Sequence, residues 1–182
     1  QVTERTVRTL GTLPQFSLTS QSGQKLGSSE LAGRTWIANF IFTRCPATCP
    51  AQTRMMAQLQ DSLKQGPGWN EISLSSFSVD PEHDTSEVLG KYARDNGADP
   101  AHWQFLTGDR NDIWNLCKDG FMLPVGENPP GELNPLFHSS KLVLIDGRGR
   151  IRGYYEGMTK EGIDGARQEI QLVVSEGTAG PT

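Results

Sequence analysis

The sequence predicts an α/β fold in which helices flank a central mixed β-sheet. Apolar runs short enough to be buried strands alternate with segments whose apolar residues recur at helical spacing. One helix separates the first two central strands, and a right-handed crossover through that helix makes the two strands parallel. Near the carboxyl end, two further apolar runs are joined by Gly147-Arg148-Gly149, which predicts a tight turn and an antiparallel pair.

The expected elements follow one another along the whole chain. They are an N-terminal β-hairpin over 16–26, a short helix over 28–33, a strand over 35–43, a helix over 50–65, a strand over 72–79, a helix from about 84 to 97, a helix opened by 107–109, strands over 141–146 and 151–155, and a closing helix over 160–174. Asp84 and Glu87 have the spacing of a capping box. We expect one domain over residues 12–176 and flexible termini over 1–11 and 177–182.

Composition narrows the possible functions. The net charge of -4 and pI near 5.4, with lysine and arginine scattered, argue against a nucleic-acid-binding surface. No segment approaches the roughly 18 uninterrupted apolar residues of a transmembrane helix. No signal-peptide core opens the chain either, so we expect any targeting segment or membrane anchor to lie outside it.

The most informative segment is Cys45-Pro46-Ala47-Thr48-Cys49-Pro50, which links the first central strand to the following helix. Thiols at positions i and i+4 of a helix start project to the same side, about 6 Å apart along the axis. They can therefore converge on one metal ion or, with local unwinding, on each other. A thiol pair at this strand-to-helix junction, within this order of elements, is typical of a thioredoxin-like fold. Thioredoxin-type enzymes have two residues between the cysteines, whereas this chain has three.

A third candidate ligand, His138, follows a long segment (123–137) that is rich in proline and glycine and has no regular pattern. Loops of this length inside compact domains are often functional. Two thiolates and an imidazole suit copper, although zinc accepts the same set. Asp80 ends the second central strand, so its carboxylate either lies near the site or completes a turn.

The remaining metal-binding side chains are interpreted as structural. His83 and His102 have neighbours typical of surface residues. Met55 and Met56 share helical spacing with apolar residues, which favours core packing. Cys117 lies among apolar residues on a predicted helix and is expected to be a small buried hydrophobe.

Five parts of the chain together match the pattern of a known family. They are residues 13–18 (LPQFSL), 42–50 (FTRCPATCP), 78–85 (SVDPEHDT), 106–108 (LTG), and His138 ahead of an apolar strand. This combination resembles the SCO/SenC family of copper-binding proteins over most of the chain, from about Leu13 to the closing helix. Members often carry aspartate before the histidine, where this chain has Phe137.

The resemblance implies a thioredoxin fold that binds copper, as Cu(I) and Cu(II), through Cys45, Cys49 and His138. It implies a metallochaperone that supports assembly of the dinuclear copper centre of cytochrome c oxidase, and hence a copper-accepting subunit as partner. It also implies an N-terminal membrane anchor, absent from this chain, and a place on the periplasmic side of the bacterial inner membrane or, less readily, in the mitochondrial intermembrane space. The protein is expected to be a monomer that binds no nucleic acid.

Two alternatives stay open at this point. In a thiol–disulfide oxidoreductase, Cys45 would attack and Cys49 would resolve the mixed disulfide. Thioredoxin-type enzymes place a cis-proline facing the thiols, whereas this chain has Ser139-Ser140 before the strand, which counts against that reading. The third possibility is a redox sensor whose thiol state is recognised by a partner.

Overall fold

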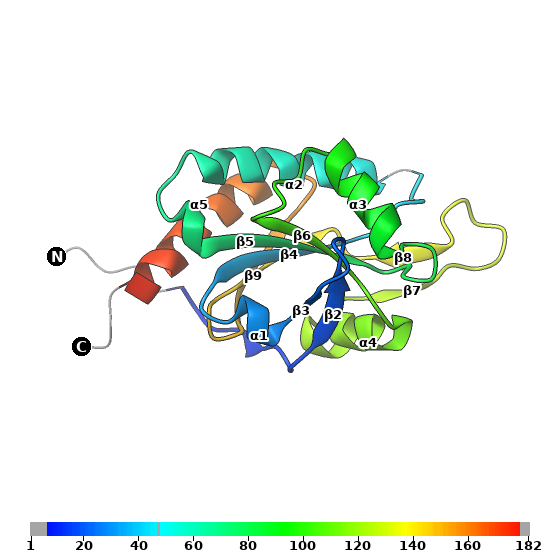
Figure 1. Cartoon of the computed structure of the whole chain (residues 1–182), viewed down its shortest axis with the longest axis horizontal. Coiled ribbons are helices and arrows are strands. Elements are labelled where there is room, and N and C mark those ends of the chain that lie inside the picture. Colours follow the sequence, from blue (N-terminus) through cyan, green and yellow to red (C-terminus); the bar gives the residue numbers. More distant parts are fainter. Residues whose placement is uncertain (1–6, 47, 179–182) are drawn as a thin grey trace.

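The structure is a computed structural model that describes residues 7–46 and 48–178. Within these residues an eight-stranded mixed sheet runs through the molecule in the order β1-β10-β9-β4-β5-β6-β2-β3. Helices α2, α3 and α5 cover one face of the sheet, and α1 and α4 cover the other (Figure 1). The predicted α/β class with a mixed, thioredoxin-like sheet is confirmed.

The elements have the following bounds. In chain order they are β1 (Gly11–Thr12), β2 (Ser17–Ser20), β3 (Lys25–Gly27), α1 (Ser28–Leu31), β4 (Thr35–Ile41), α2 (Thr48–Lys64), a 3-10 turn (Trp69–Glu71), β5 (Ile72–Ser78), α3 (Ser86–Asp95), β6 (Trp103–Thr107), α4 (Arg110–Asn115), a π-helical turn (Leu116–Gly120), β7 (Val125–Glu127), β8 (Leu136–His138), β9 (Lys141–Ile145), β10 (Arg150–Glu156) and α5 (Lys160–Thr178). The N-terminal hairpin is confirmed, because β2 and β3 pair in antiparallel register.

Three parallel strands form the centre of the sheet. β4 pairs with β5 from Thr35↔Ile72 to Ile41↔Ser78, and β5 pairs in parallel with β6. All seven residues of β4 and all seven of β5 are buried, as expected for strands covered on both faces. The carboxyl ends of these strands meet at one edge of the sheet, and the Cys45–Cys49 segment begins there.

Each face of the sheet has its own core. On the α4 side, the ring of Phe121 lies 5.2 to 6.2 Å, centre to centre, from the rings of Trp36, Phe40 and Phe77. On the other side, α2 buries Met56, Leu59 and Leu63 completely. The amphipathic spacing of that helix therefore turns its apolar side to the sheet, and Met56 packs in the core as the sequence predicted.

Three local expectations were wrong. The segment Trp103–Thr107 forms β6, which the sequence analysis did not assign to a strand. Residues 123–137, expected to be irregular, contain β7 and most of β8, which pair as an antiparallel hairpin that carries His138. Helix α3 is capped by Thr85, whose side chain accepts from the Val88 amide, so Asp84 is not the N-cap.

The two ends of the described chain lie together, at the end of the molecule opposite the β7–β8 hairpin (Figure 1). Residues 7–11, predicted as part of a flexible terminus, run along β10 and α5. The Leu10 amide donates to the Ile151 carbonyl at 2.8 Å, and the Val7 amide donates to Glu176 at 3.1 Å. Residues 1–6 and 179–182 lie outside the described residues, and the domain limits of 12–176 stay a prediction.

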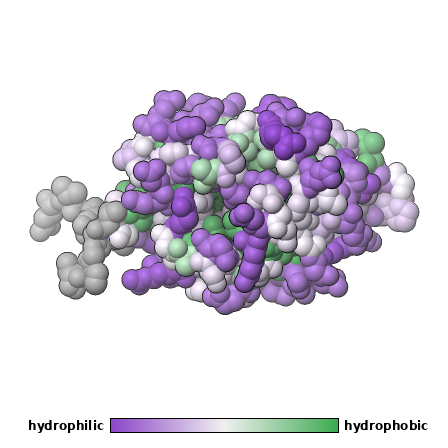
Figure 2. Space-filling view, viewed as in Figure 1, coloured by the Kyte–Doolittle hydropathy of each residue, from purple (hydrophilic) through white to green (hydrophobic). Residues whose placement is uncertain are grey.

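The face shown in Figure 2 is mainly hydrophilic, with hydrophobic residues exposed in small groups. Among the large apolar side chains, Met122, Leu133 and Phe137 are the exposed ones between the π-helical turn and the end of β8. Among the described residues, no helix is both long and apolar enough to cross a membrane.

Candidate metal centre

The two motif cysteines lie where β4 passes into α2. The Cys45 amide donates to the Phe42 carbonyl at 3.1 Å, which closes a turn directly after the strand. The Cys49 amide points back at the Cys45 sulfur, with N and Sγ 3.5 Å apart. Both side chains are buried, with 5% of Cys45 and 0% of Cys49 exposed. The helix start thus directs a backbone N–H at one sulfur, an arrangement that favours a thiolate.

His138, the last residue of β8, reaches the same place from the other end of the chain. Its Nε2 lies 3.1 Å from the Sγ of Cys49, although the two residues are 89 positions apart. The His138 ring packs edge-on against Phe42, with centroids 5.8 Å apart and planes at 86°. The structure therefore brings together two of the three ligands that the sequence predicts, and the third, Cys45, lies four residues before Cys49 with its sulfur 3.5 Å from the Cys49 amide nitrogen.

The hydrogen bonds of His138 fix which nitrogen is available. Nδ1 lies 2.9 Å from the carbonyl oxygen of Ser139, and a carbonyl can only accept, so Nδ1 carries the proton. Nε2 then presents its lone pair to Cys49. Burial lowers the pKa of His138, and the Ser139 carbonyl only partly opposes this. The imidazole is therefore neutral at pH 7, the form that binds a metal ion.

The Cys49 thiol keeps its proton in the metal-free protein. Burial raises the pKa of Cys49 well above its ordinary value, and a hydrogen bond with the Cys45 side chain raises that pKa further. Among the described residues, no group of three or more His, Cys, Asp or Glu is already arranged to hold an ion. Two sulfurs and one imidazole nitrogen nevertheless form a donor set whose chemistry suits copper.

Asp80 lies beside the thiol turn and reaches it through Arg44. The guanidinium of Arg44 donates to the Asp80 carboxylate at 2.8 Å, and Arg44 immediately precedes Cys45. The predicted role of Asp80 next to the ligands remains a prediction. Its contact orients Arg44, the neighbour of Cys45.

Two residues near the site were missed by the sequence analysis. Asp84 is fully buried, and its carboxylate accepts hydrogen bonds from Thr43 and Ser78. Gln52, only 1% exposed, donates from Nε2 to the Ser140 carbonyl at 3.0 Å. That bond joins the thiol-bearing helix to the segment after His138. A signal for Gln52 was present, because it lies three residues after Cys49 and hence on the same side of α2.

The other sulfur and imidazole groups have structural positions. Cys117 is completely buried, as predicted, and burial raises its pKa to about 12. Met55 is half-buried and packs against the core. His83 is exposed. His102 was predicted as a surface residue, but it is half-buried and stacks on Trp69 with ring centroids 3.9 Å apart.

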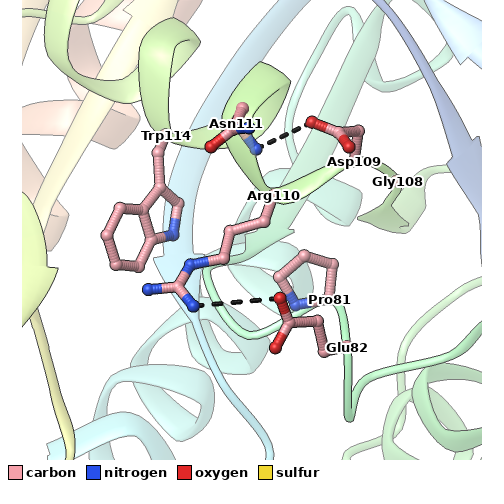
Figure 3. Close-up of a pocket in the computed structure, with 7 residues that line it drawn as sticks. All are labelled: Pro81, Glu82, Gly108, Asp109, Arg110, Asn111 and Trp114. Atoms are coloured by element: carbon pink, nitrogen blue, oxygen red, sulfur yellow. Dashed lines mark hydrogen bonds and ion pairs between the residues drawn. The ribbon is translucent and has the colours of Figure 1, made fainter.

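Arg110 connects two segments that border the site. Figure 3 shows its guanidinium beside the ring of Trp114 and pointing toward Glu82, across an open pocket. The guanidinium carbon lies 4.0 Å from the Trp114 ring centre, and the nearest oxygen of Glu82 is 3.8 Å away. Arg110 also pairs with Glu127 of β7. It therefore links the loop after β5 to the hairpin that carries His138.

The fold and the site together define a thioredoxin-like protein whose strand-to-helix junction carries a CxxxC thiol pair faced by a distant histidine. The chain matches the model of the SCO1/SenC family over residues 5–173. It belongs to the SCO1/SenC family.

Solved structures agree with this assignment. A SCO1/SenC family lipoprotein from Bacillus anthracis is 30% identical, with a TM-score of 0.83 over 91% of this chain and 97% of that one. BsSco, described with a disulfide switch and as a member of the Sco family of cytochrome c oxidase assembly proteins, is 28% identical, with a TM-score of 0.81 over 93% and 98%. Copper-bound ScoI from Bradyrhizobium japonicum is 23% identical, with a TM-score of 0.74 over 89% and 99%, and shares the fold.

Proposed function

We propose that this protein is a metallochaperone that binds one copper ion through Cys45, Cys49 and His138. The observation that carries the proposal is the 3.1 Å contact between the Cys49 sulfur and the unprotonated Nε2 of His138. A histidine that only packed in the core would not need to present its lone pair to one thiol of a buried pair. Thiolates favour Cu(I), and the imidazole allows the same site to accept Cu(II).

Each ligand contributes differently to capture and release. The N–H at the start of α2 supports negative charge on Cys45, while Cys49 gives up its proton when copper binds. His138 ends the β7–β8 hairpin, which is separate from the eight-stranded sheet, so its side chain can leave the thiols while the strand pairing of that sheet is kept. We infer that capture of the cargo requires all three side chains and that its release begins at His138.

The relatives support a physiological setting. Copper is bound in the Bradyrhizobium protein, and BsSco is described as one of the cytochrome c oxidase assembly proteins. By analogy, we propose that the partner is the copper-accepting subunit of cytochrome c oxidase or another copper protein. The lipoprotein relative supports attachment to a membrane. We propose that this domain acts as a monomer on the periplasmic side of a bacterial inner membrane.

A second candidate function is thiol–disulfide exchange, favoured by the contact between the two motif thiols. The Cys45 thiolate would attack a partner disulfide, form a mixed disulfide and release one partner thiolate. Cys49 would then attack Cys45, completing the intramolecular disulfide and releasing the second partner thiol. The described residues contain no cis peptide bond, and Ser139-Ser140 stand before β9, so the usual cis-proline surface is not present there.

Copper stoichiometry tests the first proposal. Metal-free, reduced protein loaded with Cu(I) or Cu(II) should retain one ion per chain after gel filtration. Cys45→Ser and Cys49→Ser should lose it, and His138→Ala should lose most Cu(II) affinity. Cys117→Ser and His83→Ala are the matched controls and should bind like the wild type. Full-affinity Cu(II) binding by His138→Ala would overturn the three-ligand site.

The same proteins discriminate the second function. Reduction of a protein disulfide by the metal-free chain, followed with time, measures exchange without copper. Turnover that needs Cys45 and Cys49 but is unchanged in His138→Ala would favour the oxidoreductase. The metallochaperone proposal expects slow exchange, because both sulfurs are almost inaccessible to solvent.

A further inference from the structure

We infer that Asp84 is a positioning residue: its buried carboxylate joins the carboxyl ends of β4 and β5 and thereby fixes the turn that carries Cys45. The inference rests on the proposed copper site for its functional meaning. Its structural part concerns the metal-free protein and can be tested separately.

The Asp84 side chain forms hydrogen bonds with residues at the ends of both parallel strands. Its Oδ2 accepts from the Thr43 amide at 3.0 Å and from the Ser78 hydroxyl at 2.6 Å. Its Oδ1 accepts from the Thr43 hydroxyl at 2.5 Å. Ser78 is the last residue of β5, and Thr43 follows β4 by two positions. One side chain therefore satisfies three donors at the edge where the site lies.

The loop after β5 is built to turn this carboxylate inward. The Asp84 amide donates to the Asp80 carbonyl at 2.9 Å, which closes the loop upon itself. Thr85 takes the N-cap of α3. Asp84 therefore does not cap the helix, and its side chain points into the protein interior, where none of it is exposed.

Stability alone does not account for a carboxylate at this position. A buried charge loses its hydration, a cost that is usually offset by an oppositely charged partner. The ion pairs among the described residues do not include Asp84, and its three donors are a backbone amide and two hydroxyls. A neutral residue would avoid the cost of burying the charge, so the hydrogen bonds themselves are what the position requires.

These hydrogen bonds fix the turn before Cys45. Beyond the end of β4, Thr43 is held by Asp84, Arg44 by Asp80, and the Cys45 amide by the Phe42 carbonyl. Thr43 has two of its polar groups on one carboxylate, so it is the most firmly fixed of the three. We conclude that Asp84 sets the path along which Cys45 reaches the Cys49 amide and faces the copper-binding side.

The test compares Asp84→Ala with Asp84→Asn. Alanine leaves the Thr43 amide and the Ser78 hydroxyl without their acceptor. Asparagine keeps an oxygen for both and turns its amide group to the Thr43 hydroxyl, which can accept. In metal-free protein, amide exchange at Thr43 and Cys45 should be at least about tenfold faster in Asp84→Ala, and alkylation of Cys45 should also be faster. Cu(I) affinity should fall by about tenfold or more, and asparagine should restore most of each property.

Asp146→Asn is the matched control, because Asp146 is also a buried carboxylate but lies at the other end of the sheet. It should lower the melting temperature and leave the exchange of Thr43, the alkylation of Cys45 and the copper affinity within about twofold of the wild type. If Asp84→Ala does not fold, Thr43→Val removes one of the three bonds and keeps the amide, and it should show the same changes to a smaller extent.

Wild-type amide exchange and copper affinity in Asp84→Ala, or equal changes in Asp84→Ala and Asp146→Asn, would overturn the inference. Faster Thr43 exchange in a protein whose wild type binds no copper would instead contradict the proposed function and leave the positioning role standing. Copper binding that is the same in the wild type and in Asp84→Ala would contradict the positioning role and leave the proposed function standing.

Discussion

Asp84 and Asp146 are both buried carboxylates at the edges of the same sheet, yet their surroundings differ. Asp146 accepts from the guanidinium groups of Arg150 and Arg152, at 2.8 and 3.0 Å. Asp84 accepts from one amide and two hydroxyls. The first arrangement neutralises charge where the two described ends of the chain meet the sheet, and the second orients the turn that carries Cys45.

The two carboxylates therefore have different roles: Asp146 stabilises the fold, and Asp84 positions the turn of the candidate site. At the Asp146 end, Arg152 also bonds Glu176 and the carbonyls of Val7 and Arg8, so it ties the N-terminal segment, β10 and α5 together. At the Asp84 end, hydrogen bonds hold the turn that carries Cys45 against the ends of two strands. Substitutions at the first end should change the free energy of unfolding, and those at the second should change the proposed copper site.

The largest effect is expected from Arg152→Met. The arginine side chain is only 4% exposed, and its loss leaves Asp146 with one cation and Glu176 with none. Breaking a buried ion pair in this way costs about 3–5 kcal/mol of unfolding free energy. Urea denaturation measures it, with Lys160→Met, a substitution in an exposed pair, as the control that should change little. An altered copper affinity in folded Arg152→Met would contradict the claim that substitutions at the Asp146 end change stability alone.

Gln52→Ala should have the next largest effect, and on the site more than on the fold. Its amide links α2 to the Ser140 carbonyl, which also accepts from the Gly157 amide and so keeps one hydrogen bond in the variant. The expected cost is about 0.5–1.5 kcal/mol of unfolding free energy, with copper affinity reduced several-fold because His138 is less firmly placed against the thiols. Chelator competition and urea denaturation should be measured together. A stability loss with wild-type copper affinity would confine Gln52 to a structural role.

The response to acid should distinguish the two ends further. Burial would raise the pKa of Asp146, but hydrogen bonds from the Arg150 and Arg148 amides and from the two guanidinium groups outweigh it, and the pKa lies below its usual range. The folded state therefore binds fewer protons than the unfolded chain. The stabilisation is complete above the ordinary carboxyl pKa of about 4 and is lost as pH falls through the lower, folded-state value.

Unfolding free energy measured from pH 7 to pH 2 should therefore decline less steeply in Asp146→Asn than in the wild type. Asp164→Asn, at an exposed ion pair, is the control and should follow the wild-type curve closely. Identical slopes in Asp146→Asn and the wild type would remove Asp146 from the acid response.

The smallest effect belongs to the ion pair between Arg110 and Glu127. The two side chains are 30% and 65% exposed, so the pair should contribute about 0.2–1 kcal/mol. Glu127→Gln should increase the rate of copper release about two- to fivefold through a looser hairpin, and high salt should abolish the difference. Glu132→Gln, in the connection between β7 and β8, is the matched control. Equal release rates in Glu127→Gln and the wild type at low salt would show that this pair does not hold the hairpin.

Much of the sheet and most of the site could be predicted from the sequence, because patterns of two kinds coincide there. Continuous apolar runs define buried parallel strands, and a thiol pair directly after the first of them marks the edge where such strands end. His138 was a candidate ligand because of the proline- and glycine-rich segment before it, and the family resemblance strengthened that interpretation. Its approach to Cys49 depends on a contact across 89 positions, which no local pattern shows.

The features that the sequence did not predict, namely the N-cap of α3 and strands β6, β7 and β8, have physical causes. Asp84 and Thr85 are adjacent and are both good N-cap residues, and the sequence does not say which one caps the helix and which one turns inward. β7 and β8 are three-residue strands in a segment rich in proline and glycine, so they show no alternation to detect. β6 is a five-residue strand stabilised by its neighbours β5 and β2, which are distant in sequence.

X-ray absorption at the copper edge tests the central claim most directly, because it counts the sulfur and nitrogen ligands of the bound ion. Protein loaded with one equivalent of Cu(I) should show two sulfur ligands and one imidazole nitrogen, and His138→Ala should lose the nitrogen and keep both sulfurs. A spectrum without nitrogen, or one unchanged by His138→Ala, would contradict a copper site built from Cys45, Cys49 and His138.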